Sequence, residues 1–259
     1  MEMSWLHLLK ANIRKEYIEL KRYLPNTLAL IITFYCIFLG MFAGIQIIGD
    51  PSVQDVNTQY VIVNYIVWFL AMVILQGIGG EVTNEAMRGT LEQLSMSPIG
   101  LWKIMTARLV ATTLIYFVIL VGLLYLSMLT AGEWLNVDVI TIAPILILTL
   151  ISMFGVGFMI AGISIIVKQI QSFLQILQFI LAGLTFVPLS VAPILAYFPF
   201  VKGVDLIRHV MIDGATLTQI GLGDMLILMF NAVFYFVLGL LIFLYCERVA
   251  MNKGLLAHY

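Results

Sequence analysis

Long apolar stretches alternate with short polar ones along the whole chain. A helix needs about 20 predominantly apolar residues to cross a bilayer, so this pattern predicts an all-α polytopic membrane protein with six transmembrane helices. Residues 1–259 are interpreted as a single transmembrane domain. Small residues four apart, Gly40 with Gly44 and Gly157 with Ala161, favour close packing of the helices that carry them. The predicted crossings are 26–48, 60–78, 109–129, 139–167, 170–187 and 225–245.

The fifth stretch is short for a crossing. From residue 173 to 187 a helix covers only about 22 Å of a hydrocarbon core about 30 Å thick. Residues 188–223 follow, apolar in patches and interrupted by Pro188, Pro193 and Pro199. Irregular backbone at membrane depth must be surrounded by protein or by a water-filled cavity. We therefore favour a re-entrant helical hairpin on the outer side, before the last helix, over a plain extramembrane loop.

Residues 1–24 have a different pattern, in which apolar residues recur at helical spacing and basic residues fill the positions between them. This predicts an amphipathic helix lying on the inner leaflet. Such a helix is either an anchor held by anionic lipid or a gate or docking element leading into the first crossing, and we favour the anchor. The apolar positions are Trp5, Leu8, Leu9, Ile13, Tyr17, Leu20 and Leu24.

Basic residues set the orientation of the six predicted crossings, because Lys and Arg concentrate in cytoplasmic segments. Of the 13 Lys and Arg residues, only Lys202 and Arg208 fall on the side opposite the termini. Both termini are therefore predicted to be cytoplasmic. Composition agrees with a membrane protein, since 62% of the residues are hydrophobic and 10% charged, against about 45–50% and 25% in soluble domains.

Several kinds of site are disfavoured by what the sequence lacks. No GxxxxGK[ST] motif occurs, so the chain has no P-loop for ATP. No metal site is predicted, because the three histidines are scattered and Cys36 and Cys246 lie in apolar stretches without a ligand pattern. A net charge of −1 and the lack of a basic patch interleaved with aromatic residues argue against nucleic-acid binding.

No ionisable residue lies deep inside a predicted crossing. Such residues mark ion pathways and catalytic centres, so an ion-coupled carrier and a membrane-embedded lipid enzyme are the weaker alternatives. A channel is also disfavoured, because no charged ring or filter motif is present. The sequence thus predicts a transport protein without catalytic residues, whose energy source lies outside this chain.

Residues 79–103, GGEVTNEAMRGTLEQLSMSPIGLWK, form the largest predicted cytoplasmic connection. Thr90 with Gln93 resembles a capping box, and Ser97 before Pro98 resembles an N-cap followed by a first-turn proline. The segment predicts a short amphipathic helix, a break at Gly89 and a second helix start at Pro98. A protein partner suits this mixture of charged and apolar positions, while a solvated connection is the alternative. The apolar positions are Val82, Met87, Leu91, Leu94 and Met96.

The stretch NEAMRGTLEQLSMSP resembles the E-x-x-x-G-T-L-E-x-L-x-x-S/T-P signature of the membrane subunits of type 2 ATP-binding-cassette exporters. In that family an amphipathic N-terminal helix precedes six helices, the first cytoplasmic loop forms a coupling helix, and short helices re-enter before the sixth crossing. The ATPase-coupling residues implied by the resemblance are Glu81, Glu85, Arg88, Gly89, Thr90, Leu91, Glu92, Leu94, Ser97 and Pro98.

The resemblance also implies partners. Two such subunits, identical or related, would face each other in the cell (inner) membrane, surrounded by lipid, and each would dock on a separate ATP-binding-cassette ATPase. ATP and Mg would bind to that ATPase, so no cofactor is expected in this chain. The expected cargo is a hydrophobic drug, lipid or lipid-linked molecule moved outward through the dimer interface. Polysaccharide or teichoic-acid-type glycan export is the alternative, disfavoured because the aromatic residues form no single ladder.

A polar stripe marks one face of the fifth predicted crossing: Gln171, Gln175, Gln178, Ala182 and Thr185. Hydrogen bonds between helices and contact with cargo account for this stripe equally well. In the family, helices two and five resemble the walls of the conduit, which adds Asn64 and Trp68 to the pathway candidates.

The proline-rich segment is similar to the family segment before helix six, which ends in an acidic residue and an arginine. Here that pair is Asp205 and Arg208. The Asn-Pro that usually precedes it is absent, and the sequence reads FPFVKGVD.

Overall fold

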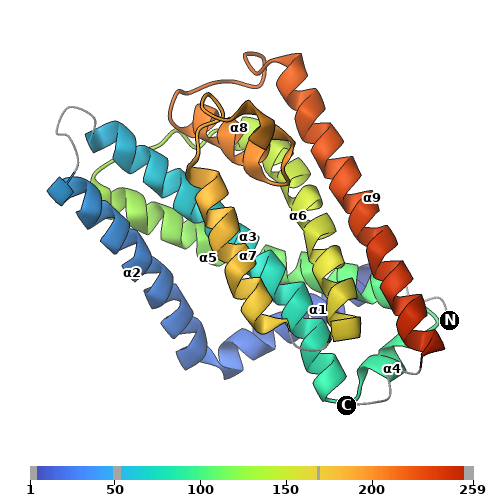
Figure 1. Ribbon diagram of the computed structural model, residues 1–259. Coiled ribbons are helices and arrows are strands. Elements are labelled where there is room, and N and C mark those ends of the chain that lie inside the picture. Colours follow the sequence, from blue (N-terminus) through green and yellow to red (C-terminus); the bar gives the residue numbers. More distant parts are fainter. Residues whose placement is uncertain (1–4, 49–53, 168–169, 254–259) are drawn as a thin grey trace.

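The computed structural model describes residues 5–48, 54–167 and 170–253, and over these residues the chain forms helices and no strand (Figure 1). The predicted all-α fold is therefore confirmed. In chain order the elements are α1 (Trp5–Arg22), α2 (Leu24–Ile48), α3 (Gln54–Met87), α4 (Leu91–Ser95), α5 (Leu101–Ala131), α6 (Val139–Val167), α7 (Gln171–Phe186), the 3-10 helix η2 (Pro193–Tyr197), α8 (Val201–Met211) and α9 (Leu222–Asn252).

Five of the described helices, α2, α3, α5, α6 and α9, are long and apolar enough to cross a membrane. They contain the predicted first, second, third, fourth and sixth crossings. The predicted fifth crossing corresponds to α7, which has 16 residues and a length of roughly 24 Å, less than the hydrocarbon core. Membrane-spanning character is thus supported for five segments, and the predicted fifth crossing, α7, stays a prediction.

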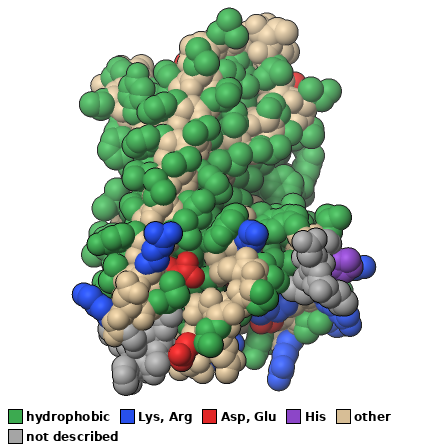
Figure 2. Space-filling view, turned by 90° about the vertical axis from the view of Figure 1, so that its right-hand side faces the viewer, with side chains coloured by type: hydrophobic (Ala, Val, Ile, Leu, Met, Phe, Trp, Pro, Cys, Tyr) green, Lys and Arg blue, Asp and Glu red, His purple; other side chains and the backbone are tan. Residues whose placement is uncertain are grey.

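One face of the molecule carries a broad apolar region, with most of the charge seen on that face at one end. Figure 2 shows hydrophobic side chains over most of the middle of one face and Lys and Arg side chains toward the bottom. Figure 1 places α1, α4 and the C-terminal end of α9 at this same end, and α8 at the opposite end. Exposed Leu226, Phe230 and Leu241 on α9 suit contact with lipid, where apolar surface carries no cost.

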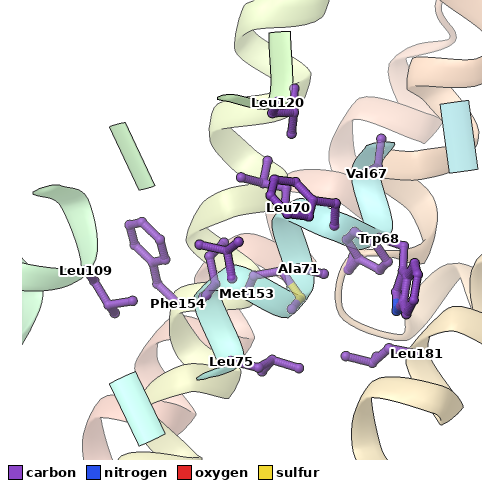
Figure 3. Close-up of a cluster of buried hydrophobic side chains, with 14 of the residues drawn as sticks. Val67, Trp68, Leu70, Ala71, Leu75, Leu109, Leu120, Met153, Phe154 and Leu181 are labelled. Atoms are coloured by element: carbon purple, nitrogen blue, oxygen red, sulfur yellow. The ribbon is translucent and has the colours of Figure 1, made fainter. Parts of the chain in front are cut away.

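The central helix of the bundle is α3. Its most apolar window is 72% buried, and nearly every residue from 62 to 75 is shielded from solvent. A helix that is apolar on all sides lies in a protein core or in a membrane, and here other helices cover most of α3. Figure 3 shows side chains of α3, including Leu70 and Leu75, among Leu109 of α5, Phe154 of α6 and Leu181 of α7.

The closest helix pair is α6 with α9, which run side by side in Figure 1. A Cβ atom on Gly155 of α6 would lie 2.1 Å from the backbone oxygen of Tyr235 in α9. Glycine at such positions lets two helix backbones approach closely. Of the small-residue pairs predicted to pack, Gly157 contacts Ile78 of α3, whereas the Cβ position of Gly40 has nothing within 4 Å.

Two short helices, η2 and α8, occupy the segment between α7 and α9. Most of α8 is buried, and it lies so close to α6 that a Cβ on Gly203 would be 1.9 Å from Oγ1 of Thr149. Pro193 begins η2, Pro199 is buried just before α8, and Pro188 is exposed at the start of a turn. Short helices packed on the bundle are what a re-entrant hairpin requires, and their depth in the membrane stays a prediction.

Candidate functional site

The predicted coupling segment, residues 79–103, begins as part of α3. This helix continues without a break to Met87, so Glu81 and Glu85 lie in its last turns, and the prediction of a separate short helix there is wrong. The predicted break at Gly89 is confirmed, because this residue has a φ of +69°. Glycine adopts this left-handed conformation without a steric penalty and commonly ends helices. The five residues of α4 follow directly.

Thr90 ties this turn back to α3. Its hydroxyl lies 3.2 Å from the backbone oxygen of Glu85 and also hydrogen-bonds to the carboxylate of that residue. The predicted capping box with Gln93 is wrong, since the Thr90 side chain makes no capping bond to α4. Its hydroxyl is already used by the end of α3. Two residues of the family signature therefore hold the shape of the loop.

The start of α5 also differs from the prediction. The helix begins at Leu101, not at Pro98. Gly100 precedes it with a φ of +83°, which redirects the chain and keeps Pro98 outside the helix. Ser97 does act as a local acceptor, because its hydroxyl receives a 3.4 Å hydrogen bond from the backbone N–H of Ile99.

The predicted coupling residues divide into an inward set and an outward set. Leu91 and Val82 are buried inside the subunit, so Val82 offers no apolar contact to a partner. Arg88 and Glu92 are exposed, and so are large apolar side chains beside them, with Met96 exposed to 77%. Leu94 is half-buried against the core and Pro98 is exposed. The surface formed by Met87, Arg88, Glu92 and Met96 is here named the α4 face.

A charge cluster lies directly behind the α4 face. Nη1 of Arg108, on α5, is 2.9 Å from a carboxylate oxygen of Glu81 and 2.7 Å from one of Glu85. Nζ of Lys15, on α1, is 3.3 Å from Glu81 and 3.8 Å from Glu19. The cluster therefore joins α1, α3 and α5 at the end of the molecule that carries α4.

Sequence reasoning missed Arg108 and Lys15 as members of this cluster. A signal was present, because Glu81 and Glu85 are four residues apart and share one helix face. Half-buried carboxylates on one face need a cation close by. The sequence does not say which basic residue supplies it, since Arg108 is 23 residues from Glu85 and Lys15 is 66 from Glu81.

Acidic residues of α1 extend the cluster. Carboxylate oxygens of Glu16, Glu19 and Glu81 lie within 4.8 Å of one another. Thr112 of α5 donates a 2.9 Å hydrogen bond to Glu16. Burial raises the pKa of the Glu16 carboxyl above its ordinary value and outweighs this hydrogen bond, which lowers it. The sequence predicted no metal site. Among the residues that the structure describes, these three carboxylates are close enough together to hold a metal ion.

Two predicted pathway residues meet beside a groove. The indole Nε1 of Trp68 donates a 3.2 Å hydrogen bond to the backbone oxygen of Gln178, and both residues line a groove of about 470 Å³ between α2, α3 and α7. Phe34, 4.5 Å from Phe69 between ring centroids, also lines it. The groove is mainly apolar and is open between α2 and α7.

The other pathway candidates lie elsewhere. Asn64 is buried within the bundle, where its Oδ1 has no hydrogen-bond partner. Gln171 and Gln175 are exposed on α7. Thr185 is buried, and its hydroxyl donates to the backbone oxygen of Ala182 within α7 at 2.6 Å. The predicted stripe is thus divided between a buried side and an exposed side.

The acidic–arginine pair of α8 belongs to a second charge cluster at the opposite end of the molecule. Nη2 of Arg208 is 3.7 Å from Asp205, and Lys202 bonds to both Asp205 (3.3 Å) and Asp224 of α9 (2.8 Å). The guanidinium of Arg208 lies 5.4 Å from the ring centre of Tyr60 in α3. This cluster holds α8 against α3 and α9.

A comparison with known protein families identifies the family to which this chain belongs. The model of the ABC-2 family transporter proteins matches residues 43–241, from α2 into α9. The chain belongs to the ABC-2 family. As an ABC-2 transporter protein it is a multi-pass membrane component of a transport system. The matched part includes the α4 face and the α3 and α7 walls of the groove, while α1 and the part of α2 that lines the groove precede it. No curated protein matches the chain.

Proposed function

We propose that this ABC-2 chain is the membrane subunit of an ATP-driven exporter and that a separate ATP-binding-cassette ATPase docks on the α4 face. The observation that carries this proposal is the α4 face itself, where exposed charges and methionines sit on a loop that Thr90 and Glu85 hold rigid. Exposed apolar side chains beside charged ones are typical of a protein interface. ATP and Mg would bind to the ATPase.

The structure offers a direct route for force from the α4 face. A push on α4 reaches α3 through the turn at Gly89 and the contact between Thr90 and Glu85. The same helix carries Trp68 at the groove. Motion of α3 as a rigid body would therefore alter the groove, because most of the apolar part of α3 is packed inside the bundle and packed cores transmit displacement.

The proposal also includes the assembly of two subunits and the chemical class of the cargo. Two subunits, identical or related, would face each other across α2 and α7, with the termini in the cytoplasm and the chain in the cell (inner) membrane. The groove between these helices is lined mostly by apolar and aromatic side chains. This lining supports export of a hydrophobic drug, lipid or lipid-linked molecule outward along the subunit interface.

Charge reversal on the α4 face tests the docking. We expect Arg88→Glu and Glu92→Lys each to reduce export by roughly tenfold or more while the protein stays in the membrane, because reversed rim charges repel the partner that they attracted. Arg248→Glu is the matched control, since Arg248 is exposed at the same end of the molecule on α9 and should leave export unchanged. Export by membrane vesicles and ATP hydrolysis by the purified complex are the measurements.

Copurification tests the partner independently. The tagged protein, extracted in mild detergent, should bring a P-loop ATPase in stoichiometric amount, identified by mass spectrometry. A chain that carries both charge reversals should lose that ATPase. A protein isolated without any nucleotide-binding partner, or export unaffected by both reversals, would contradict docking at this face.

A further inference from the structure

The helix α1 has three faces, and the rest of the described chain covers one of them. Leu8 and Asn12 are the buried residues of this covered face. On the same side, Nζ of Lys15 is 3.3 Å from a carboxylate oxygen of Glu81 in α3, and Glu16 accepts the hydrogen bond from α5. The covered face therefore joins α1 to the last turns of α3 and to α5.

A row of basic residues lies on the opposite side of α1. A period of 3.6 residues per turn places Lys10, Arg14 and Lys21 on one side of the helix, and all three are exposed. They are here named the basic stripe. No carboxylate among the described residues pairs with any of the three. The acidic residues of α1, Glu16 and Glu19, are half-buried away from this side.

An open depression of about 430 Å³ lies along the basic stripe. Its described lining contains no acidic residue. The described lining residues are His7, Lys10, Ala11, Arg14, Lys15 and Ile18. Positive charge is thus concentrated around one hollow of the surface, and a negatively charged partner would be complementary to it.

The third face of α1 is an exposed apolar edge between the basic stripe and the covered face. Leu6 is exposed to 73% and Tyr17 to 61%, while Ile13 and Leu20 are half-buried. Exposed apolar side chains beside a basic row are typical of helices that lie in a membrane interface. Figure 1 places α1 at the end of the bundle that carries α4, where the apolar surface of the long helices ends.

These observations point to one partner, a lipid that carries negative charge. We infer that the basic stripe binds anionic phospholipid headgroups of the leaflet on the α4 side, with the apolar edge among their acyl chains, and that this lipid holds α1 against α3 and α5. A soluble anion would leave the apolar edge uncovered, and a zwitterionic lipid would leave the basic stripe without a counter-charge.

The lipid would act on more than the position of α1. Lys15 joins this helix to Glu81, which lies in the last turns of α3 before the α4 face. Anionic lipid bound to α1 therefore stabilises the end of α3 on which the proposed coupling depends. An effect on export rests on the proposed function, but lipid binding and its effect on α3 do not.

Native mass spectrometry of the full-length chain, purified in detergent without an ATPase and titrated with phospholipid, tests the binding. Phosphatidylcholine with the same acyl chains as the phosphatidylglycerol used is the matched lipid control, and the Kd of the phosphatidylglycerol should be at least roughly tenfold lower. The double variant Lys10→Gln/Arg14→Gln should raise the Kd for phosphatidylglycerol by roughly tenfold or more, because each basic residue near anionic lipid contributes about a fivefold factor. Its Kd for phosphatidylcholine should stay the same.

Arg248→Gln/Lys253→Gln is the control variant. It removes the same two positive charges from exposed positions at the C-terminal end of α9, which lies at the same end of the molecule, and it should leave the Kd for phosphatidylglycerol within twofold. An equal effect of the two double variants would show that binding follows net charge alone and would overturn the inference. Should Lys10→Gln/Arg14→Gln fail to accumulate, Lys21→Gln replaces it, with an expected rise of about fivefold.

Glycerol 3-phosphate distinguishes a lipid from a free phosphate, because it has a charged phosphate and no acyl chains. At millimolar concentration it should leave phosphatidylglycerol bound. Displacement would show a phosphate site without a role for the apolar edge, and would overturn the inference, as would equal affinity for the two phospholipids or an unchanged Kd in the stripe variants.

Hydrogen–deuterium exchange tests the effect on α3. Phosphatidylglycerol, and not phosphatidylcholine, should slow amide exchange in α1 and in residues 81–87, since a helix end opens less often when its contacts are held. Lys15→Gln should retain the slowing in α1 and lose it in residues 81–87. Slowing confined to α1 in the wild-type chain would overturn the link to α3. The proposed function fails separately, through the absence of a copurifying ATPase, because no ATPase takes part in these measurements.

Discussion

At the scale of single residues, the structure separates the predicted coupling residues that shape the loop from those that face outward. Glu85 and Thr90 bond to each other, and Leu91 is buried. Arg88 and Glu92 are exposed. In the proposed docking, one short motif has two functions, because a docking surface would transmit force only when its own backbone is fixed.

The contact of Thr90 with Glu85 gives a direct stability prediction. Thr90→Val keeps the shape of the side chain and removes the hydroxyl, so it should lower the free energy of unfolding by about 1.5 kcal/mol, the lower end for a hydrogen bond to a charged group. Thr90→Ser retains the hydroxyl and should stay close to wild type. Thermal unfolding of the detergent-purified protein measures both, and equal melting temperatures for the two variants would contradict this role.

Glu16 gives a pH prediction. Its pKa is raised in the folded protein above the ordinary value of 4.5, chiefly by burial, with Glu81 and Glu19 adding repulsion and Lys15 and Thr112 opposing it. As the pH rises from about 4.5, the unfolded chain releases this proton before the folded chain does, so the contribution of Glu16 to folding becomes less favourable. The contribution of Glu16 to stability in this window should therefore fall as pH rises.

The Glu16→Gln substitution replaces this carboxyl with an amide, which does not titrate. The melting temperature of the variant should depend less on pH than that of wild type, with the variant gaining relative stability toward pH 8. The comparison is Glu133→Gln, at a carboxylate that accepts a 2.8 Å hydrogen bond from Gln59, and thermal unfolding in one detergent across the pH range is the measurement. Parallel pH curves for wild type and Glu16→Gln would show that the burial of this carboxyl has no such effect.

At the scale of helices, small residues determine which neighbours touch. Gly155 and Gly239 place α6 and α9 backbone to backbone, and Gly203 lets α8 lie directly against Thr149 of α6. The length of α3 is equally decisive, since its continuation to Met87 puts the carboxylates that pair with Arg108 on a rigid helix. The elements nearest the proposed docking site are therefore parts of the central bundle.

Glycine substitution tests the packing of α6 with α9. Gly155→Ala places a Cβ 2.1 Å from the Tyr235 carbonyl oxygen, which should lower the free energy of unfolding by about 3 kcal/mol, the upper end for overpacking. Gly122→Ala in α5 is the matched control, because nothing lies within 4 Å of its Cβ position. The control should unfold at or slightly above the wild-type temperature, since alanine favours helices.

At the scale of the whole molecule, charge lies at two ends of an apolar bundle. The cluster of Arg108 joins α1, α3 and α5 beside α4, while the cluster of Lys202 joins α8 to α9 at the opposite end. The groove at Trp68 lies between these ends, against α3. This arrangement allows a movement imposed at α4 to reach the groove through one helix.

Substitution of two glutamines on α7 tests whether these side chains contact cargo or only pack against other helices. Gln178 lines the groove, so Gln178→Leu should shift the relative export of different hydrophobic cargoes by several-fold, about the effect of one or two hydrogen-bond energies. Gln175→Leu, on the exposed side of α7, should change cargo preference only where that face meets a second subunit. Export of paired substrates and melting temperature are the readouts, and a loss of stability in Gln178→Leu without a change in preference would favour packing.

The helical membrane character, the positions of the long helices and the break at Gly89 could be predicted from the sequence alone, because hydrophobic length and glycine act locally. The fixed spacing of the coupling signature was equally visible there. The pairing of Arg108 and Lys15 with Glu81, the bond of Thr90 to α3 and the meeting of Gln178 with Trp68 emerged only in three dimensions. These contacts join residues on different helices or across a turn, and they depend on how the helices pack, which apolar periodicity alone does not specify.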